Sequence, residues 1–598
     1  MSIDEKEGQG IHENRRLIDA ATRKGNAEGR MAMKQWEKEL RENIYSQNPD
    51  FRHSIRYYFP DGADRIHMAL EQFGDLVPKK LEPLVVENDF RFNLPRLEAY
   101  DSIGERCDKI IHHPTYVQAG NIIYGSRMME KVSKPGNLLE SLALFFISSH
   151  AGEAGHNCPV ACTAGVLRVL NKFPDIPNHS FFNERLIDPS YETNFTGAQF
   201  VTEIQGGSDV GLNDALAFQD SEGQWRIRGE KWFCSNANAD IILITARYDE
   251  SISGTKGLGL FLVPATLPDG QKNLYSLRRL KEKIGTRSMA SAEIDFNGAM
   301  AHPVGELRNG FKTLMENVLH LSRIYNTFAA LGVGRRAYQI ALNYTKHRIA
   351  FEQPVFRYPL VKENLARIKA ENTAMLAFIM KTTEMQDQYD TGQLYQAETP
   401  LLLRLLANLN KYISARWTVD HVHHSIDMLA GNGAIESFSS LPRLLRDSIV
   451  IENWEGTHNT LRMQILRDIH KYHIDEIYLN YMDKQLSKIG NEKDWLDPIN
   501  IKLKTLNQDL IHLKKSSPEL QSLRIRDIVD QMALLSCALN LFLEGRHQEE
   551  TANGSSKLNC LRYFYLLHFQ PEKPVYDEAY VKLISEIVAD RGELILDL

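Results

Sequence analysis

The chain has 598 residues and a formal net charge of −7, and its apolar fraction of 43% and charged fraction of 25% are ordinary for a soluble globular protein. This length gives a prior of about three to five domains. The slightly acidic balance offers no overall electrostatic case for binding nucleic acid or an anionic membrane. The six cysteines form no CxxC pair and no disulfide-like spacing, which is typical of reduced thiols in a cytoplasmic protein.

The N-terminus is acidic and lacks the apolar core of a signal peptide. No run of about 18 apolar residues predicts a membrane span. We therefore expect a cytoplasmic protein without a membrane segment.

The pattern along the chain predicts a mainly α protein with a central β domain. Residues 1–45 are polar and of mixed charge, and they predict either a mobile arm or a solvated helix. Residues 46–197 carry apolar residues at three-and-four spacing, which predicts a helical domain. Alternation, β-branched runs and turn signals predict a compact β domain over 198–302. Helical periodicity returns in 303–475, which predicts a bundle, and continues in 476–598 as an additional helical domain.

One carboxylate has an unusual setting. Glu455 stands between Trp454 and Gly456, where an apolar run ends and a helix-like segment begins. A carboxylate beside an aromatic ring is partly desolvated, which raises its pKa toward that of a general base. Thr457 is placed to cap the helix that follows. The ordinary alternative is a first-turn charge that meets the helix dipole.

Two motifs in the predicted β domain suit a cofactor. In Phe200–Asp209, two glycines among small hydroxyl and carboxyl groups leave backbone N–H groups free to meet a phosphate. In Gly229–Asn236, the aromatic pair Trp232-Phe233 and the hydroxyl of Ser235 would stack on a planar group and bind its edge. The alternatives are an ordinary glycine turn and aromatic residues of the core.

Two further motifs lie in the second helical region. Arg348 and Phe351 are three residues apart near the end of a long predicted helix, so a guanidinium and a ring would face the same way. This suits a phosphate and an adenine, and the alternative is a surface Arg over a buried Phe. Leu429–Gly433 is a glycine break between helices. The histidines have no zinc-like spacing, so we expect no metal site.

Together and in this order, the motifs resemble those of the acyl-CoA dehydrogenase family of flavoproteins, over roughly residues 100–470. The resemblance implies a helical domain, a β-barrel domain and a four-helix bundle with FAD between them, usually in a homotetramer. The Trp before the Glu, the aromatic pair with its Ser, Asn459 and the C-terminal helical extension are most similar to the AidB-type, alkylation-response branch.

The resemblance also implies roles for individual residues. Glu455 falls on the family's catalytic base, which removes the proton α to the thioester carbonyl while the β hydrogen leaves as hydride to flavin N5. Some relatives carry the base just before a family Arg on an earlier helix; here that pair is Ser322-Arg323, which leaves Glu455 as the base candidate. Arg323 and Ser208 are the implied substrate contacts, and His320 replaces an Asp that some relatives use on the CoA adenine. The implied FAD contacts are Thr202, Ser208, Phe233, Ser235, Arg348, Phe351, Gly431, Gly433, Thr457 and Asn459, with Arg348 and Phe351 reaching the FAD of a neighbouring subunit.

We therefore predict an FAD-dependent acyl-CoA dehydrogenase of fatty acid metabolism that passes electrons to an external acceptor such as an electron-transfer flavoprotein. The alternative is a flavoprotein of the same fold that mainly binds DNA or an acyl ligand. Residues 475–598 carry 15 Lys and Arg against 20 Asp and Glu, which argues against a DNA-binding extension. A local basic patch between Lys502 and Arg526 leaves that alternative open.

Overall fold

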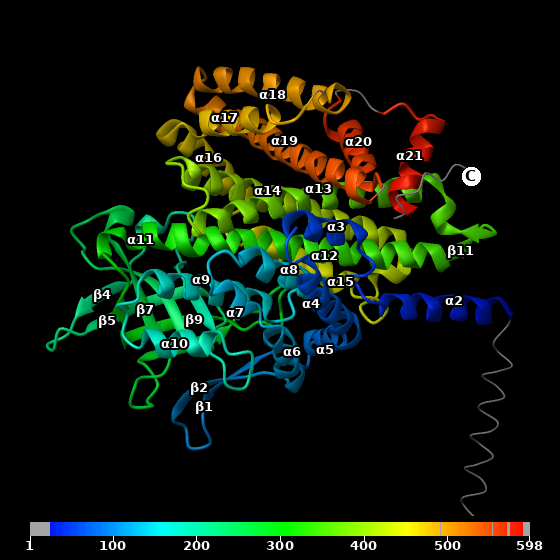
Figure 1. Ribbon diagram of the computed structural model, residues 1–598. Coiled ribbons are helices and arrows are strands. Elements are labelled where there is room, and N and C mark those ends of the chain that lie inside the picture. The colour runs from blue at the N-terminus through cyan, green and yellow to red at the C-terminus, as the bar shows by residue number, and fades with distance from the viewer. Residues whose placement is uncertain (1–23, 491, 553, 571–573, 590–598) are drawn as a thin grey trace, which may run out of the picture.

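The computed structural model describes residues 24–490, 492–552, 554–570 and 574–589. Figure 1 shows a helical N-terminal region and a β domain on one side of a long helix bundle, with the C-terminal helices stacked on the other side. The predicted fold class, mainly α with a central β domain, is confirmed.

The N-terminal region is built from short helices around a buried centre. Its helices are α2 (Lys24–Leu40), α3 (Pro49–Tyr58), α4 (Ala63–Leu76), α5 (Glu82–Asp89), α6 (Pro114–Gly125), α7 (Met128–Val132), α8 (Leu138–Ser148), α9 (Asn157–Lys172) and α10 (His179–Leu186). Every residue of α8 is buried, so this apolar helix is the core of the region.

A β-hairpin interrupts this helical region. Strand β1 (Arg96–Tyr100) pairs antiparallel with β2 (Arg106–Ile111). Between them, the Asp101 carboxylate accepts hydrogen bonds from the backbone N–H groups of Ile103 and Glu105, both at 2.9 Å. A side chain that closes its own turn in this way favours a hairpin over a helix. The helical interpretation of 46–197 is wrong at this point.

Helix α2 forms most of the described part of the predicted arm, residues 24–45, whereas residues 1–23 lie outside the described residues. Trp36 is only 2% exposed. Its indole N–H donates to the Ile340 carbonyl of the bundle at 3.3 Å, and its ring stacks on Phe438 at 5.1 Å. One face of α2 is therefore fixed on the bundle, so it is neither a free arm nor a helix solvated on all sides.

The β domain is one eight-stranded sheet in the order β10-β7-β6-β4-β5-β9-β8, with β3 paired parallel to β6. Its strands are β3 (Gly197–Phe200), β4 (Leu216–Gln219), β5 (Trp225–Ser235), β6 (Ile241–Arg247), β7 (Leu258–Pro264), β8 (Tyr275–Leu280), β9 (Ser291–Met300) and β10 (His302–Pro303). Ala198 and Phe200 of β3 belong to the core of the sheet, so the side chain of Gln199 between them lies on the opposite face.

The bundle follows a short helix α11 (Gly310–Leu314). It contains α12 (His320–His347), α13 (Pro359–Asp390), α14 (Thr399–Met428) and α15 (Leu441–Asn453), and it is followed by α16 (His458–Tyr472). All residues from Leu321 to Thr345 of α12 are buried, which makes α12 the central helix, covered on every side.

The C-terminal extension packs on the bundle as a further layer. Its helices are α17 (Ile474–Leu486), α18 (Lys493–Lys514), α19 (Pro518–Ala552), α20 (Ser556–His568) and α21 (Glu578–Ala589). Glu371 of α13 lies 2.7 Å from a ring nitrogen of His421 of α14 and 3.0 Å from one of His568 of α20. This buried carboxylate joins the extension to two helices of the bundle.

Within the described residues, one helix, Pro518–Thr551, is long and apolar enough to cross a membrane by length and composition alone. Because 83% of its most apolar window is buried inside the molecule, it has the character of a core helix. In the same part of the chain, no group of three or more His, Cys, Asp or Glu side chains is placed to hold a metal ion.

Candidate active site

Glu455 lies in the short loop between α15 and α16. Its φ of +59° is unusual for a residue with a side chain, and Gly456 follows with a φ of +105°. The Thr457 hydroxyl accepts from the backbone N–H of Thr460 at 3.5 Å, so the predicted cap of the following helix is confirmed. Two left-handed residues and a cap turn the chain sharply and present the Glu455 side chain to the interior.

The carboxyl group of Glu455 has one bound oxygen and one free oxygen. Oε1 accepts a hydrogen bond from the Gln199 amide at 3.1 Å. Oε2 is buried and has no hydrogen-bond partner within the described residues. Burial raises the pKa of Glu455, against the opposing effect of Arg323, Lys411 and the Gln199 hydrogen bond.

Two buried cations hold the backbone around this carboxylate. Arg323 Nε donates to the Glu455 carbonyl at 3.2 Å, and Lys411 Nζ donates to the carbonyls of Glu452 and Gly456 at 2.8 and 2.7 Å. Burial lowers the pKa of Arg323 to about 10 and that of Lys411 to about 7. The loop is therefore fixed from α12 and α14 by charges that also favour an ionised Glu455.

Ser322, which the family resemblance matches to an alternative base position, lies on α12. It is 4% exposed, and its hydroxyl accepts from the same Gln199 amide at 3.2 Å. A hydroxyl cannot replace a carboxylate as a base near neutral pH. Of these two positions, only Glu455 carries a basic side chain.

A cavity of about 700 Å³ is lined by residues of the N-terminal region and the bundle, including Arg323. Arg323 also donates to the backbone carbonyl of Glu455, so it connects the wall of the cavity with the Glu455 loop. His320 lies in its wall, with a ring nitrogen 2.8 Å from Gln386 Oε1, and burial lowers its pKa to about 4. His320 is therefore uncharged at neutral pH. Arg168, also in the wall, forms a paired contact with Asp390 at 2.6 and 2.7 Å.

The predicted cofactor residues of the β domain border one another. The N–H of Trp232 donates to the Thr202 carbonyl at 2.9 Å, which places the aromatic pair of β5 beside the loop after β3. Phe233 is 57% exposed, which is unusual for a large ring in a sheet. Ser235 lies 3.3 Å from the Ser291 hydroxyl, which accepts from Lys283 at 3.0 Å.

The predicted residues of the first motif and of α16 also meet. The exposed hydroxyl of Ser208 lies 3.4 Å from that of Thr460, in the first turn of α16 beside Thr457 and Asn459. A helix N-terminus with adjacent hydroxyls suits a phosphate, and an exposed ring suits the face of a flavin. The residues present therefore fit FAD.

Four of the predicted FAD contacts lie away from the Glu455 loop. No contact within the described residues brings Arg348, Phe351, Gly431 or Gly433 to Glu455. Asn432 between the two glycines donates to the Tyr344 hydroxyl at 3.2 Å, which places this turn near the end of α12, next to Arg348.

The helical spacing assumed for Arg348 and Phe351 is wrong. Helix α12 ends at His347, and β11 (Ile349–Ala350) pairs with β12 (Gln353–Pro354) in a hairpin. Phe351 and Glu352 both have positive φ, as a two-residue hairpin turn requires. Phe351 is 91% exposed, so it is not a buried ring under a surface Arg either.

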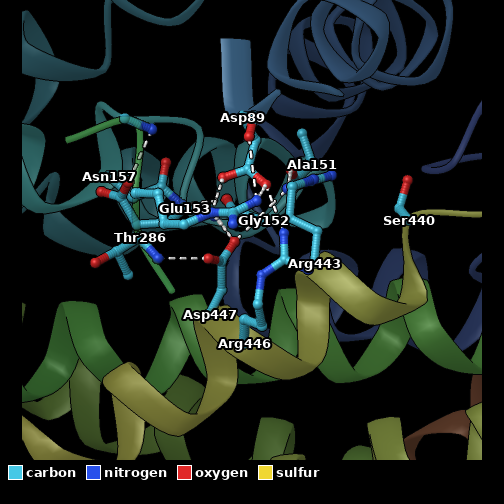
Figure 2. Close-up of polar contacts among 12 residues, drawn as sticks. Asp89, Ala151, Gly152, Glu153, Asn157, Thr286, Ser440, Arg443, Arg446 and Asp447 are labelled. Atoms are coloured by element: carbon cyan, nitrogen blue, oxygen red, sulfur yellow. Dashed lines mark hydrogen bonds and ion pairs between the residues drawn. The ribbon is translucent and has the colours of Figure 1, made fainter. Parts of the chain in front are cut away.

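Sequence reasoning missed a buried polar cluster behind the active-site loop (Figure 2). Asp447 of α15 accepts from the backbone N–H of Thr286 at 2.7 Å and from that of Glu153 at 3.2 Å. Arg443 donates to the Ala151 carbonyl at 2.6 Å, and Arg446 donates to Asp89 at 2.6 Å. These contacts fix α15, and hence the loop with Glu455, to both the N-terminal region and the β domain.

Two glycines allow this close approach. A Cβ on Gly285 would collide with the carbonyl of Arg446, and a Cβ on Gly152 would collide with the Arg443 guanidinium. In the sequence, these two glycines were the only sign of this close approach. A glycine alone does not reveal which distant helix approaches it.

Glu153 is the most perturbed acid of this cluster. Its oxygens accept from the N–H groups of Gly155 and Cys158 at 2.8 and 3.0 Å. Burial, and then the negative charge of Asp447, raise its pKa to about 8 in spite of these bonds. Burial also lowers the pKa of nearby Lys283 to about 8. The two groups titrate as a pair.

Three sequence domains account for most of the chain. Residues 35–193 match the N-terminal domain of the adaptive response protein AidB, 198–299 match the middle domain of acyl-CoA dehydrogenases, and 308–470 match their C-terminal domain. Fold and site together define a flavin-dependent oxidoreductase. The chain belongs to the acyl-CoA dehydrogenase family, whose cofactor is FAD, and it carries the AidB type of N-terminal domain.

Relatives of the same arrangement are similar over most of their length. Acyl-CoA dehydrogenase family member 11 of Caenorhabditis elegans is 28% identical over 93% of this chain and 91% of its own. The putative acyl-CoA dehydrogenase AidB of Escherichia coli is 27% identical over 75% of this chain and 80% of its own. The crystal structure of C. elegans ACDH-11 in complex with C11-CoA superposes with a TM-score of 0.81 at 26% identity, over 92% of this chain and 95% of that one.

Proposed function

We propose that this protein oxidises a fatty acyl-CoA to the trans-2,3-enoyl thioester, with Glu455 as the base and hydride transfer to N5 of FAD. One observation carries the proposal: the carboxylate of Glu455 has a raised pKa and keeps its buried Oε2 without a hydrogen-bond partner among the described residues, and the neighbouring Arg323 lines a cavity of about 700 Å³. A carboxylate with a raised pKa and an oxygen free to accept a proton has the two properties that a general base requires.

The chain's own residues supply the proton chemistry. Glu455 Oε2 would take the proton from the carbon α to the thioester carbonyl, which is only weakly acidic and needs a close, desolvated base. Arg323 and Lys411 hold the loop carbonyls and so restrain the loop that carries the carboxylate. When bound, FAD supplies the acceptor for the hydride that leaves the β-carbon.

Residues of the β domain and of the start of α16 would hold FAD. Phe233 would contact the flavin ring, Ser235 its edge, and Thr202 and Ser208 its polar groups, with Thr457 and Asn459 at the start of α16. Arg348, Phe351, Gly431 and Gly433 would reach the FAD of another subunit in a homotetramer. The tetramer is part of the proposal and is supported by the exposure of Phe351.

The cavity supports a thioester substrate with a polar tail. The cations Lys172 and Arg323 line it, together with the carboxylate-paired Lys134, Arg168 and Arg404 and uncharged His320. Cations suit the phosphates of CoA, and Arg323 and Ser208 are the proposed substrate contacts. The crystallised relative is in complex with C11-CoA, which supports the same substrate class here. An external electron acceptor, such as an electron-transfer flavoprotein, and a cytoplasmic location complete the proposal.

The alternative is a flavoprotein of this fold that mainly binds DNA or an acyl ligand. The basic patch of the extension offers little support for DNA, because Lys514 pairs with Asp475 at 2.7 Å and Lys502 donates to the His568 carbonyl at 3.2 Å. The cavity itself would serve an acyl ligand equally well. The free oxygen of Glu455 favours chemistry.

An anaerobic titration with acyl-CoAs of increasing chain length tests the proposal. We expect bleaching of the flavin absorbance within one range of chain lengths. A bound flavin that no acyl-CoA reduces would favour the binding alternative, to be followed by DNA and acyl-ligand binding assays. A protein that takes up no FAD would contradict the cofactor assignment.

A further inference from the structure

Gln199 connects the β domain to the active-site loop through one amide. Its Nε2 donates to Glu455 Oε1 at 3.1 Å and to the Ser322 hydroxyl at 3.2 Å. Both amide hydrogens are therefore used. The Gln199 Oε1 atom is buried and has no hydrogen-bond partner within the described residues. No sequence motif marked this residue.

The backbone of strand β3, from which the Gln199 side chain extends, is held in place by its surroundings. Its neighbours Ala198 and Phe200 are fully buried in the sheet core. The N–H of Gly197 donates to the Thr163 hydroxyl of α9 at 2.9 Å, and a Cβ on Gly197 would lie only 2.7 Å from Val166. Because the strand is held by the sheet on one side and by α9 on the other, the amide has little freedom to move away from Glu455.

This hydrogen bond distinguishes the two oxygens of Glu455. Oε1 is occupied by the amide, whereas Oε2 is buried and free. An amide N–H stabilises the ionised carboxylate, and it continues to donate to Oε1 when the proton is carried by Oε2. The bond is therefore kept in both protonation states.

We infer that Gln199 is a positioning residue that fixes Glu455 so that Oε2 receives the α-proton, an inference that rests on the proposed role of Glu455 as base. The α-carbon–hydrogen bond breaks and an O–H bond forms at Oε2. The electron pair of the broken bond becomes the new double bond as the β hydrogen leaves as hydride to FAD. Gln199 contacts neither the proton nor the hydride.

Other groups near Glu455 also titrate or carry charge. Arg323 faces it from α12, Lys411 from α14, and the thiol of Cys158 from α9. Lys411, with a pKa of about 7, titrates close to neutral pH. These groups are unchanged when Gln199 is replaced, so a difference between wild type and variant isolates the amide.

The variant Gln199→Met keeps the shape of the side chain and removes the donor. We expect the rate constant for flavin reduction by acyl-CoA to fall about 10- to 100-fold, as for loss of a hydrogen bond to a charged group. Loss of the donor raises the pKa of Glu455, so the acid limb of the rate profile moves to higher pH and the defect shrinks at alkaline pH. A merely structural defect would lower the rate equally at all pH values.

A matched variant and a second measurement complete the test. Gln224→Met removes an amide-to-carbonyl bond of 3.1 Å elsewhere in the β domain and should leave reduction unchanged. The infrared carboxylic-acid band that is absent in Glu455→Gln reports protonation of Glu455 without turnover. Its midpoint should rise in Gln199→Met, with bound FAD and thermal midpoint retained.

The outcomes separate the inference from the proposed function. An unmoved infrared midpoint, or an undiminished reduction rate, overturns the role of Gln199 even if wild type is an active dehydrogenase. A wild type that no acyl-CoA reduces overturns the proposed function instead. The infrared midpoint then still decides whether Gln199 holds Glu455.

Discussion

Glu455 and Glu371 are two buried carboxylates of the same half of the molecule, and they are bound in opposite ways. Glu371 accepts from His421 at one oxygen and from Arg367 and His568 at the other. Glu455 accepts from one uncharged amide and keeps the second oxygen free. Glu371 is satisfied at both oxygens and joins three helices, whereas Glu455 keeps an oxygen that can still accept a proton.

The pKa values of the two carboxylates are shifted in opposite directions, as their different partners would lead one to expect. Burial alone would raise the pKa of Glu371, but hydrogen bonds from His421 and His568 outweigh it and hold the pKa well below its usual range. Burial raises the pKa of Glu455 because only an amide and more distant cations oppose it. The partners of the two carboxylates therefore account for the opposite directions of their pKa shifts.

The largest expected effect is that of Glu455→Gln. We expect flavin reduction by acyl-CoA to fall about 10²- to 10⁴-fold, because proton abstraction loses its base. FAD content should not change, since the hydrogen bond of the side chain is to Gln199 and not to a proposed FAD contact. Stopped-flow absorbance checks this, and undiminished reduction would remove Glu455 from the mechanism.

Glu371→Gln should show the reverse behaviour. Breaking a buried ion pair leaves its partners uncompensated, so we expect a loss of about 3–5 kcal/mol in the free energy of unfolding, with flavin reduction retained below the unfolding transition. The folded pKa lies below the unfolded value of 4.5. The contribution of Glu371 to the free energy of unfolding is therefore present at neutral pH and is lost on acidification. Denaturant titrations at several pH values measure the loss of stability and its pH dependence. A variant that is as stable as wild type but reduces flavin slowly would contradict a structural role for Glu371.

Glu153 is an intermediate case, with a raised pKa but both oxygens bound. Its folded pKa of about 8 lies above the unfolded 4.5, so its contribution to stability is full below that lower value and is lost as pH rises toward 8. One proton corresponds to a slope of about 1.4 kcal/mol per pH unit. We expect Glu153→Gln to remove this slope from the pH dependence of unfolding. An identical slope in wild type and variant would mean that Glu153 is ionised in the folded protein.

The smallest expected effect is a loss of stability in the segment next to Glu455, where Thr457 caps α16. Thr457→Ala removes the cap of α16 and should cost about 1 kcal/mol of stability. Thr505→Ala, at an exposed position inside α18, is the matched control and should cost nothing. Thermal unfolding measures both. Equal midpoints for the two variants would show that α16 does not depend on its cap.

The sequence was informative where a feature is local. Helical and strand periods predicted the order of helical, β and helical regions, and Thr457 could be identified as a cap because capping involves residues three apart. Glu455 was identified from its immediate neighbours together with the family resemblance. Arg348 and Phe351 failed for a local reason, because a two-residue turn broke the helix on which their spacing was measured.

What the sequence could not provide were contacts between distant segments. Gln199 is 256 residues from Glu455, and Asp447 is 294 residues from Glu153. Gln199 lies in an otherwise apolar strand, and one polar residue there gives no direction to a partner. The hairpin β1–β2 was missed because its short strands lie within a long helical stretch.

Helix α19 has a consequence for the making of the protein. Its long apolar segment is covered by the helices on both sides of it in the chain, including α20, which leaves the ribosome after it. Until α20 is synthesised, the growing chain exposes a surface that resembles a membrane anchor. We expect the interval between the synthesis of α19 and that of α20 to be one in which the chain needs protection from aggregation, and fragments that end before residue 556 to be retained by chaperones.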